Sequence, residues 1–246
     1  MGERFVLQIS TKFILMKNAI FCLLTVTIGF ACNPSHHFPA KIGLLRLGKM
    51  DETLFAQAKN EIEVFYNAEV VDLDEKALPK LAFYAPRNRY RADKLIDWLQ
   101  GIRPDSVDFI LGLTASDISH TKGDIKDYGI MGLAYRPGSS GVVSVFRVGK
   151  GAKNKAQIEE RFSKLVLHEL GHNFGIKHCT RSKLCLMRDA CGTVKTLDGE
   201  SKNVCENCRK QLGKLLRDQA ITMSRCSTNS SDLTKNRSSP GKSLGR

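Results

Sequence analysis

Three of the six histidines of this 246-residue chain, together with a glutamate, fall within eleven residues at the spacing H-E-x-x-H-x-x-G-x-x-H. On a helix, residues four apart point the same way, so His168 and His172 can bind one metal ion. Gly175 then allows the chain to leave the helix and to return His178 as a third ligand. Three neutral imidazoles with an open fourth position are typical of a catalytic zinc site. A chance grouping of surface histidines rarely produces this extended spacing.

Glu169 directly follows the first histidine, so it is rotated away from the metal ion that His168 would bind. From there its carboxylate can reach a water molecule on that ion. Zinc lowers the pKa of bound water from about 16 to about 7 and polarises a carbonyl oxygen. Glu169 would take the water's proton as general base and pass it to the leaving amine. The segment therefore predicts hydrolysis of peptide bonds.

The residues that follow His178 make the functional prediction more specific. His178 is followed at once by Cys179, then by Cys185-Leu186-Met187, and after seventeen residues by Cys205-Glu206-Asn207-Cys208. In this the chain resembles the archaemetzincin family of metzincin zinc metallopeptidases. The resemblance implies a metzincin-like α/β (α+β) zincin fold, with a mixed twisted sheet and helices in an N-terminal subdomain, an active-site helix, and an irregular C-terminal subdomain holding a four-cysteine zinc site. It also implies that Met187 is the Met-turn residue beneath the histidines.

Four cysteines are predicted to bind a second, structural zinc: Cys179, Cys185, Cys205 and Cys208. The C-x-x-C pair formed by the last two is a common half-site for zinc. Five residues, 180–184, separate the first two cysteines, whereas the family pattern has four. Disulfides are the alternative, because an exported protein meets an oxidising compartment. We expect two zinc ions per chain and assign no role to Cys191 or Cys226.

The elements that must position these residues follow from the apolar patterns. Strands are predicted at 42–47, 69–73, 107–113, 129–135 and 141–148, and helices at 51–66, 91–100, 155–174 and 203–218. Asp51 is the expected N-cap of the first helix, and Gly101 the expected stop of the second. The strands 129–135 and 141–148 should pair antiparallel, and by resemblance 129–135 is the edge strand that binds substrate backbone. The catalytic domain is predicted at 40–222, with subdomains 40–175 and 176–222.

Both ends of the chain are predicted to lie outside this domain. Residues 16–32 resemble a secretory signal, with a basic residue before an uncharged apolar run at 19–31. That run of 13 residues is too short to span a bilayer, where about 20 are needed. Cys32 is a lipidation candidate at a loose lipobox, and translation could start at Met1 or at Met16. We expect an exported protein, periplasmic or anchored to the membrane by a lipid, with a cytoplasmic protein as the alternative. The polar residues 227–246 are predicted to be a disordered tail.

The net charge of +13 is the remaining unusual feature. It favours acidic partners, but no nucleic-acid-binding signature accompanies it, so we expect no specific nucleic acid partner. The expected partner is a peptide or protein substrate of a monomeric enzyme. One alternative is a zinc-stabilised basic binding module without peptidase activity, although such a module needs no general base. A zinc deaminase is a weaker alternative, because its glutamate lies two residues after the histidine and cysteines bind the same ion.

Overall fold

The computed structural model describes residues 40–190 and 192–216. Three predictions lie outside these residues and stay predictions: the signal at 16–32, the lipidation candidate Cys32 and the tail at 227–246. Cys191 and Cys226, to which no role was assigned, also lie outside them. Within the described part, no helix has the length and apolar character needed to cross a membrane.

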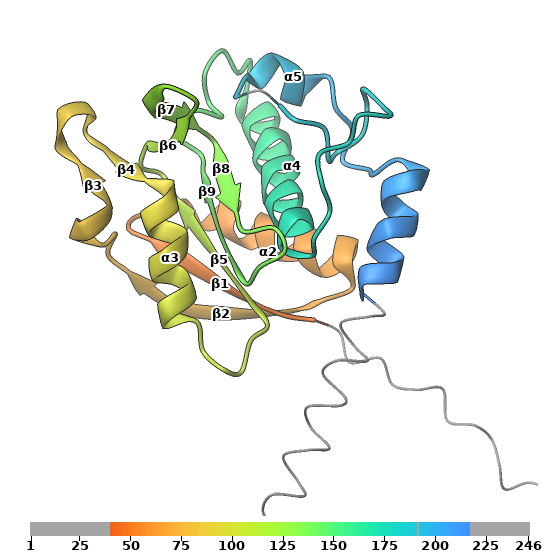
Figure 1. Cartoon of the computed structure of the whole chain (residues 1–246), viewed down its shortest axis with the longest axis horizontal. Helices are drawn as coiled ribbons and strands as arrows, with labels where there is room; N and C mark the ends of the chain where they lie inside the picture. The colour runs from red at the N-terminus through yellow and green to blue at the C-terminus, as the bar shows by residue number, and fades with distance from the viewer. Residues whose placement is uncertain (1–39, 191, 217–246) are drawn as a thin grey trace, which may run out of the picture. The chain divides into compact units, whose positions relative to one another are not determined.

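A five-stranded mixed sheet forms the centre of the fold (Figure 1). Its strands, in spatial order, are β2 (Glu69–Lys76), β1 (Lys41–Leu47), β5 (Phe109–Thr114), β9 (Ser140–Ser144) and β8 (Gly132–Ala134). The first four run parallel, and β8 pairs antiparallel to β9 at the edge of the sheet. The β-α-β opening and the antiparallel pairing predicted from the sequence are confirmed.

Helices cover both faces of this sheet. α2 (Glu52–Tyr66) and α4 (Lys155–Asn173) pack with Phe109, Leu111 and Leu113 of β5 in one apolar core. α3 (Ala92–Ile102) packs with Ile110 of the same strand in a second core on the other face. Successive side chains of a strand point to opposite faces, so the uninterrupted apolar run of β5 is explained by burial on both sides.

The helix boundaries follow the local signals closely. Asp51 caps α2 by accepting a hydrogen bond from the backbone N–H of Leu54 at 3.0 Å. The predicted stop of α3 at Gly101 was wrong, because the helix continues to Ile102. Arg103 ends it instead, since the residue before Pro104 is held in an extended conformation.

A second sheet was not predicted. It has the order β3 (Phe83–Tyr84), β4 (Arg89–Arg91), β6 (Ile118–Lys122) and β7 (Ile125–Ile130), with short 3-10 turns η1 (Lys80–Ala82) and η2 (Ala85–Arg87) around β3. The single strand predicted at 129–135 is wrong, because its first part pairs with β6 and only Gly132–Ala134 pairs with β9. Met131 is buried where the chain passes from one sheet to the other.

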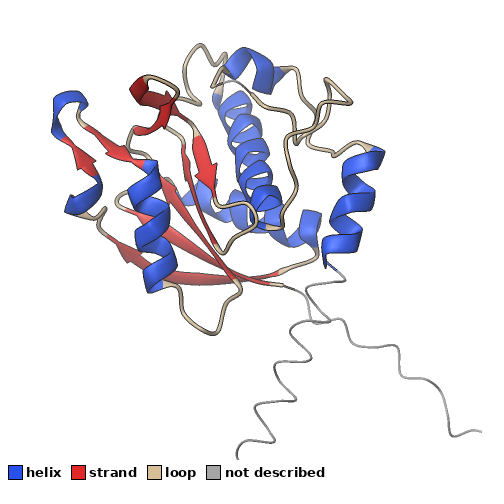
Figure 2. Ribbon diagram, in the orientation of Figure 1, coloured by secondary structure: helices blue, strands red, loops and turns tan. Residues whose placement is uncertain are grey.

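The remaining chain is largely irregular, as Figure 2 shows by the loops that follow α4. The strand predicted at 141–148 ends at Ser144, after which the chain turns, with the N–H of Val148 bonded to the carbonyl of Val145. Beyond α4 lie α5 (Val194–Asp198) and a helix over 206–216. The latter begins three residues later than predicted, because the N–H of Cys205 bonds to the sulfur of Cys185 instead of entering a helix. The mixed α/β fold class is confirmed.

Candidate metal centre

The three histidines of the motif meet at one point. α4 begins at its N-cap Asn154, whose side chain accepts from the N–H of Gln157, and its second half is buried. His168 and His172 lie in that half, one helical turn apart. Gly175 adopts a φ of +101°, which favours glycine, and redirects the chain so that His178 returns to them. One ring nitrogen from each histidine lies within 4.8 Å of the others, and the Nε2 atoms of His172 and His178 are 3.0 Å apart.

Backbone carbonyls orient two of these rings. The Nδ1 atom of His168 is 2.8 Å from the carbonyl oxygen of Leu186, and that of His172 is 2.7 Å from the carbonyl oxygen of Ile176. A carbonyl can only accept, so Nδ1 carries the proton and the Nε2 lone pair is free to bind metal. Burial lowers the pKa of His168 to about 4 and of His172 to about 3. Neutral imidazoles with free Nε2 atoms fit a zinc ion well.

Glu169 lies beside the histidines in the same cavity, which has a volume of about 640 Å³. Its side chain is buried, and without a metal ion burial raises the pKa of its carboxyl group to about 8. The positive charge of a zinc ion on the neighbouring histidines would lower this pKa and favour the carboxylate. β8 forms one wall of the cavity, and its three residues all line it. β8 is the edge strand of its sheet, so its outer side pairs with no strand among the described residues.

Met187 packs against α4 next to the histidines. It is fully buried, and its sulfur packs so closely on the α4 backbone that a Cβ added at Gly171 would be 2.5 Å from Sδ. Gly171 lies between His168 and His172 on α4 and directly precedes His172. Met187 therefore supports the helix at the level of these two histidines. The Met-turn role of Met187 stays a prediction.

The four predicted cysteines form a second cluster. Their sulfur atoms all lie within 4.8 Å of one another, and those of Cys179 and Cys205 are 3.6 Å apart. A disulfide needs about 2.05 Å, whereas sulfurs bound tetrahedrally to zinc at about 2.3 Å are roughly 3.8 Å apart. Each of the four is a free thiol, so the geometry favours the metal site over the disulfide alternative.

The extra residue between Cys179 and Cys185 does not open this cluster. The loop bulges outward at Leu184, which is exposed, and it closes through hydrogen bonds from the N–H groups of Leu184 and Cys185 to Ser182. A third hydrogen bond, from the N–H of Cys179 to the carbonyl of Met187 at 2.7 Å, connects the cysteine cluster to the residue that packs against α4.

Sequence reasoning missed three residues in and around the cavity. Gly132 and Glu200 line the cavity, and Gly132 lies against Glu169. Gly171 lies outside the lining and packs against Met187. A glycine inside an apolar strand pattern is a known sign of close backbone approach, so Gly132 carried a usable signal. Glu200 carried no such signal, because an isolated glutamate in a polar loop is usually exposed to solvent.

The chain is similar to known proteins both in sequence and in structure. The sequence profile of Peptidase family M54 matches residues 59–214. An archaemetzincin from Haloquadratum walsbyi is 30% identical over 178 residues, which cover 70% of this chain and 98% of that protein. The crystal structure of archaemetzincin from Methanopyrus kandleri superposes with a TM-score of 0.63 at 27% identity, covering 75% of this chain and 99% of that one. The archaemetzincin from Archaeoglobus fulgidus, complexed with malonate, gives a TM-score of 0.59 at 27% identity, covering 69% and 98%.

Proposed function

Since this chain belongs to peptidase family M54, the archaemetzincins, and is therefore a zinc metallopeptidase, we propose that His168, His172 and His178 hold its catalytic zinc and that Glu169 is its general base. The observation that carries the proposal is the convergence of three ring nitrogens beside the carboxylate of Glu169 in one cavity. When bound, the zinc activates a water molecule for attack and polarises the peptide carbonyl. Glu169 accepts the water's proton and delivers it to the nitrogen of the leaving amine.

The substrate is an extended peptide, because β8 offers it an edge. A strand added there would form backbone hydrogen bonds with Gly132–Ala134 and would run past the histidines. Main-chain pairing positions the peptide but does not distinguish between its side chains. Any side-chain preference therefore has to come from the rest of the cavity.

The cysteine cluster is the second part of the proposal. Cys179, Cys185, Cys205 and Cys208 hold a structural zinc, which makes two zinc ions per chain. Because Cys179 follows His178 directly, the structural zinc fixes the backbone that carries the third histidine.

Glu169→Gln tests the catalytic role. The amide keeps the size of the side chain but cannot accept the proton, so we expect retained zinc and a loss of kcat of at least about 100-fold. The matched control is Glu52→Gln, which removes an exposed carboxylate that pairs with Arg46 on the surface and should leave turnover unchanged. A Glu169→Gln variant with undiminished, chelator-sensitive peptidase activity would contradict the role of Glu169. Binding of an acidic partner without cleavage of any peptide would instead favour the basic binding module.

A further inference from the structure

The cavity that contains the three histidines is also lined by apolar residues outside the motif. Among them are Leu165, one turn before Glu169 on α4, and Leu197 of α5, both of them buried. Glu200, in the loop after α5, lines the same cavity.

Glu200 is only 5% exposed, and its Oε1 atom is shielded from solvent without any hydrogen-bond partner among the described residues. Burying a carboxylate without a partner is costly, so buried carboxylates are normally paired or hydrogen-bonded. Burial raises the pKa of the Glu200 carboxyl group to about 7, because removal from water disfavours its charged form.

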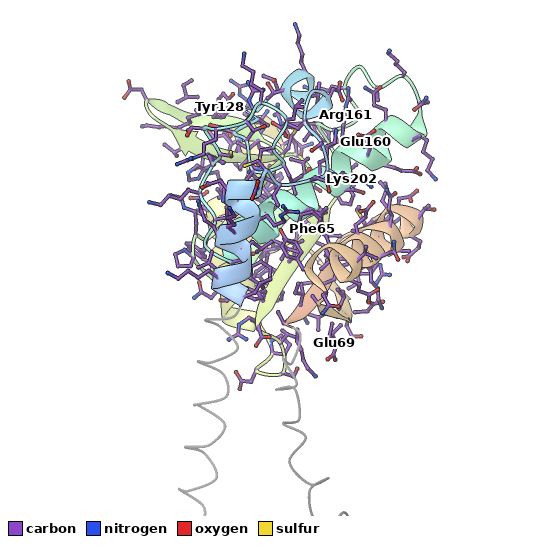
Figure 3. All side chains as sticks on the ribbon, turned by 90° about the vertical axis from the view of Figure 1, so that its right-hand side faces the viewer. Phe65, Glu69, Tyr128, Glu160, Arg161 and Lys202 are labelled. Atoms are coloured by element: carbon purple, nitrogen blue, oxygen red, sulfur yellow. The ribbon has the colours of Figure 1, made fainter. Side chains whose placement is uncertain are left out.

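The basic residues near Glu200 are held by other groups. Lys164 bonds to the carbonyl of Leu197 at 3.1 Å and pairs with Glu160 at 2.8 Å. Figure 3 labels Glu160 and Arg161 on the first half of α4, and Arg161 is itself paired with Asp198 at 2.6 Å.

Arg188 also acts on Glu200 through its charge, but its Nη1 atom bonds to the carbonyl of Lys183 at 3.2 Å. Asp189, which also lines the cavity, adds a further negative charge whose field acts on Glu200. Glu200 therefore offers the proposed substrate cavity a carboxylate oxygen that can still bind a cation.

We propose that Glu200 is a specificity-determining residue that binds the cationic side chain, lysine or arginine, of a substrate residue next to the scissile bond. The aliphatic stem of such a side chain packs against Leu165 and Leu197, and its charged end reaches the carboxylate. This inference rests on the proposed peptidase function, because it assigns the preference of the same site.

The test uses N-acetylated and amidated peptides, so that the side chain under test supplies the cation. Pairs of peptides differ only by lysine or norleucine at each residue flanking the scissile bond. At one of these positions we expect the full-length, zinc-loaded enzyme to prefer lysine by about 10-fold or more in kcat/KM, as for one charge-assisted hydrogen bond. In Glu200→Gln this ratio should fall to within about 2-fold of unity, whereas the Glu52→Gln control should keep the wild-type ratio.

A binding measurement separates this inference from the catalytic proposal. Calorimetric titration with the lysine peptide compares Glu169→Gln with the double variant Glu169→Gln/Glu200→Gln, neither of which needs to turn over. We expect Kd to rise by about 10-fold in the double variant. Equal affinities, or equal cleavage of the lysine and norleucine peptides at every position by the wild type, would overturn the role of Glu200. Failure to cleave any peptide would instead count against the proposed function.

Discussion

Gly132 of the edge strand β8 lies directly against the carboxylate of Glu169 on α4. A Cβ added at Gly132 would be 2.5 Å from Oε1 of Glu169 and 2.8 Å from its Cδ, well inside van der Waals contact. The absent side chain therefore lets the strand that would bind substrate backbone approach Glu169, the proposed general base. The two proposed functions, pairing with the peptide and transfer of the water's proton, would meet at this contact.

Gly132→Ala should displace the Glu169 carboxylate and lower kcat/KM by about 10-fold or more, because small misplacements of a reacting group are costly. The matched control is Gly101→Ala in α3, where an added Cβ meets no atom within 4 Å. That variant should keep full activity and gain up to about 1 kcal/mol of stability, since alanine favours a helix over glycine. Steady-state kinetics and thermal unfolding of both variants measure these effects. Full activity in Gly132→Ala would show that the contact is dispensable.

The parts of this site that the sequence predicted are the local ones. The spacing of His168, His172 and Glu169 is determined by one helix, and α4 was predicted to within one residue at its C-terminal end. The residues 129–135 were wrongly predicted as one strand, because their first part pairs with the preceding strand β6 and their last part with the following strand β9. An apolar pattern does not show where the chain changes from one partner to the other. Glu200 could be recognised as a candidate site residue only from its burial, which depends on the packing of α5 against α4.

The two proposed metal sites should respond differently to loss of a ligand. His178→Ala removes one histidine ligand, so we expect one zinc per chain, retained by the cysteines, and no measurable peptidase activity. Cys179→Ser opens the cysteine cluster, so we expect loss of the structural zinc and destabilisation by several kcal/mol. Because Cys179 adjoins His178 and its N–H bonds to Met187, the remaining zinc should also bind more weakly.

Elemental analysis of zinc after dialysis, with thermal unfolding of the same samples, measures both variants. Each serves as the control for the other, since each removes one site and spares the other's ligands. Two zinc ions retained in Cys179→Ser, or a wild type with fewer than four titratable thiols in the cluster under denaturing conditions, would contradict the structural zinc.

Met187→Ala should destabilise the protein by about 2–5 kcal/mol, the usual cost of emptying a fully buried site of this size. Because Met187 supports the backbone of Gly171, part of the cost should also appear as weaker zinc binding by the histidines. Leu184→Ala is the matched control, since this side chain is 64% exposed and should change stability by less than about 0.5 kcal/mol. Denaturant titration of both variants measures the difference. Equal stabilities would refute the supporting role of Met187.

The unpaired carboxylate of Glu200 should make stability depend on pH. Its folded-state pKa of about 7 lies above the ordinary value of 4.5, because burial outweighs the favourable fields of Arg188 and Lys164 and adds to the unfavourable field of Asp189. Below about pH 4.5 both states are protonated, so Glu200 has no effect. As the pH rises towards 7 the unfolded state ionises first, so the folded state loses stability, and the full cost is reached above the folded pKa.

Replacing Glu200 by glutamine removes that cost and should therefore stabilise the free enzyme at high pH. Calorimetry in a Glu169→Gln background, which prevents self-cleavage, should give a Tm for Glu200→Gln about 2–4 °C or more above its parent at pH 8. At pH 4.5 the two should unfold within about 1 °C of each other. Saturating lysine peptide should narrow the gap at pH 8, because it binds more tightly to the variant that keeps the carboxylate's charge and so stabilises that variant more. A constant difference in Tm across this range would mean that Glu200 is already paired in the free enzyme.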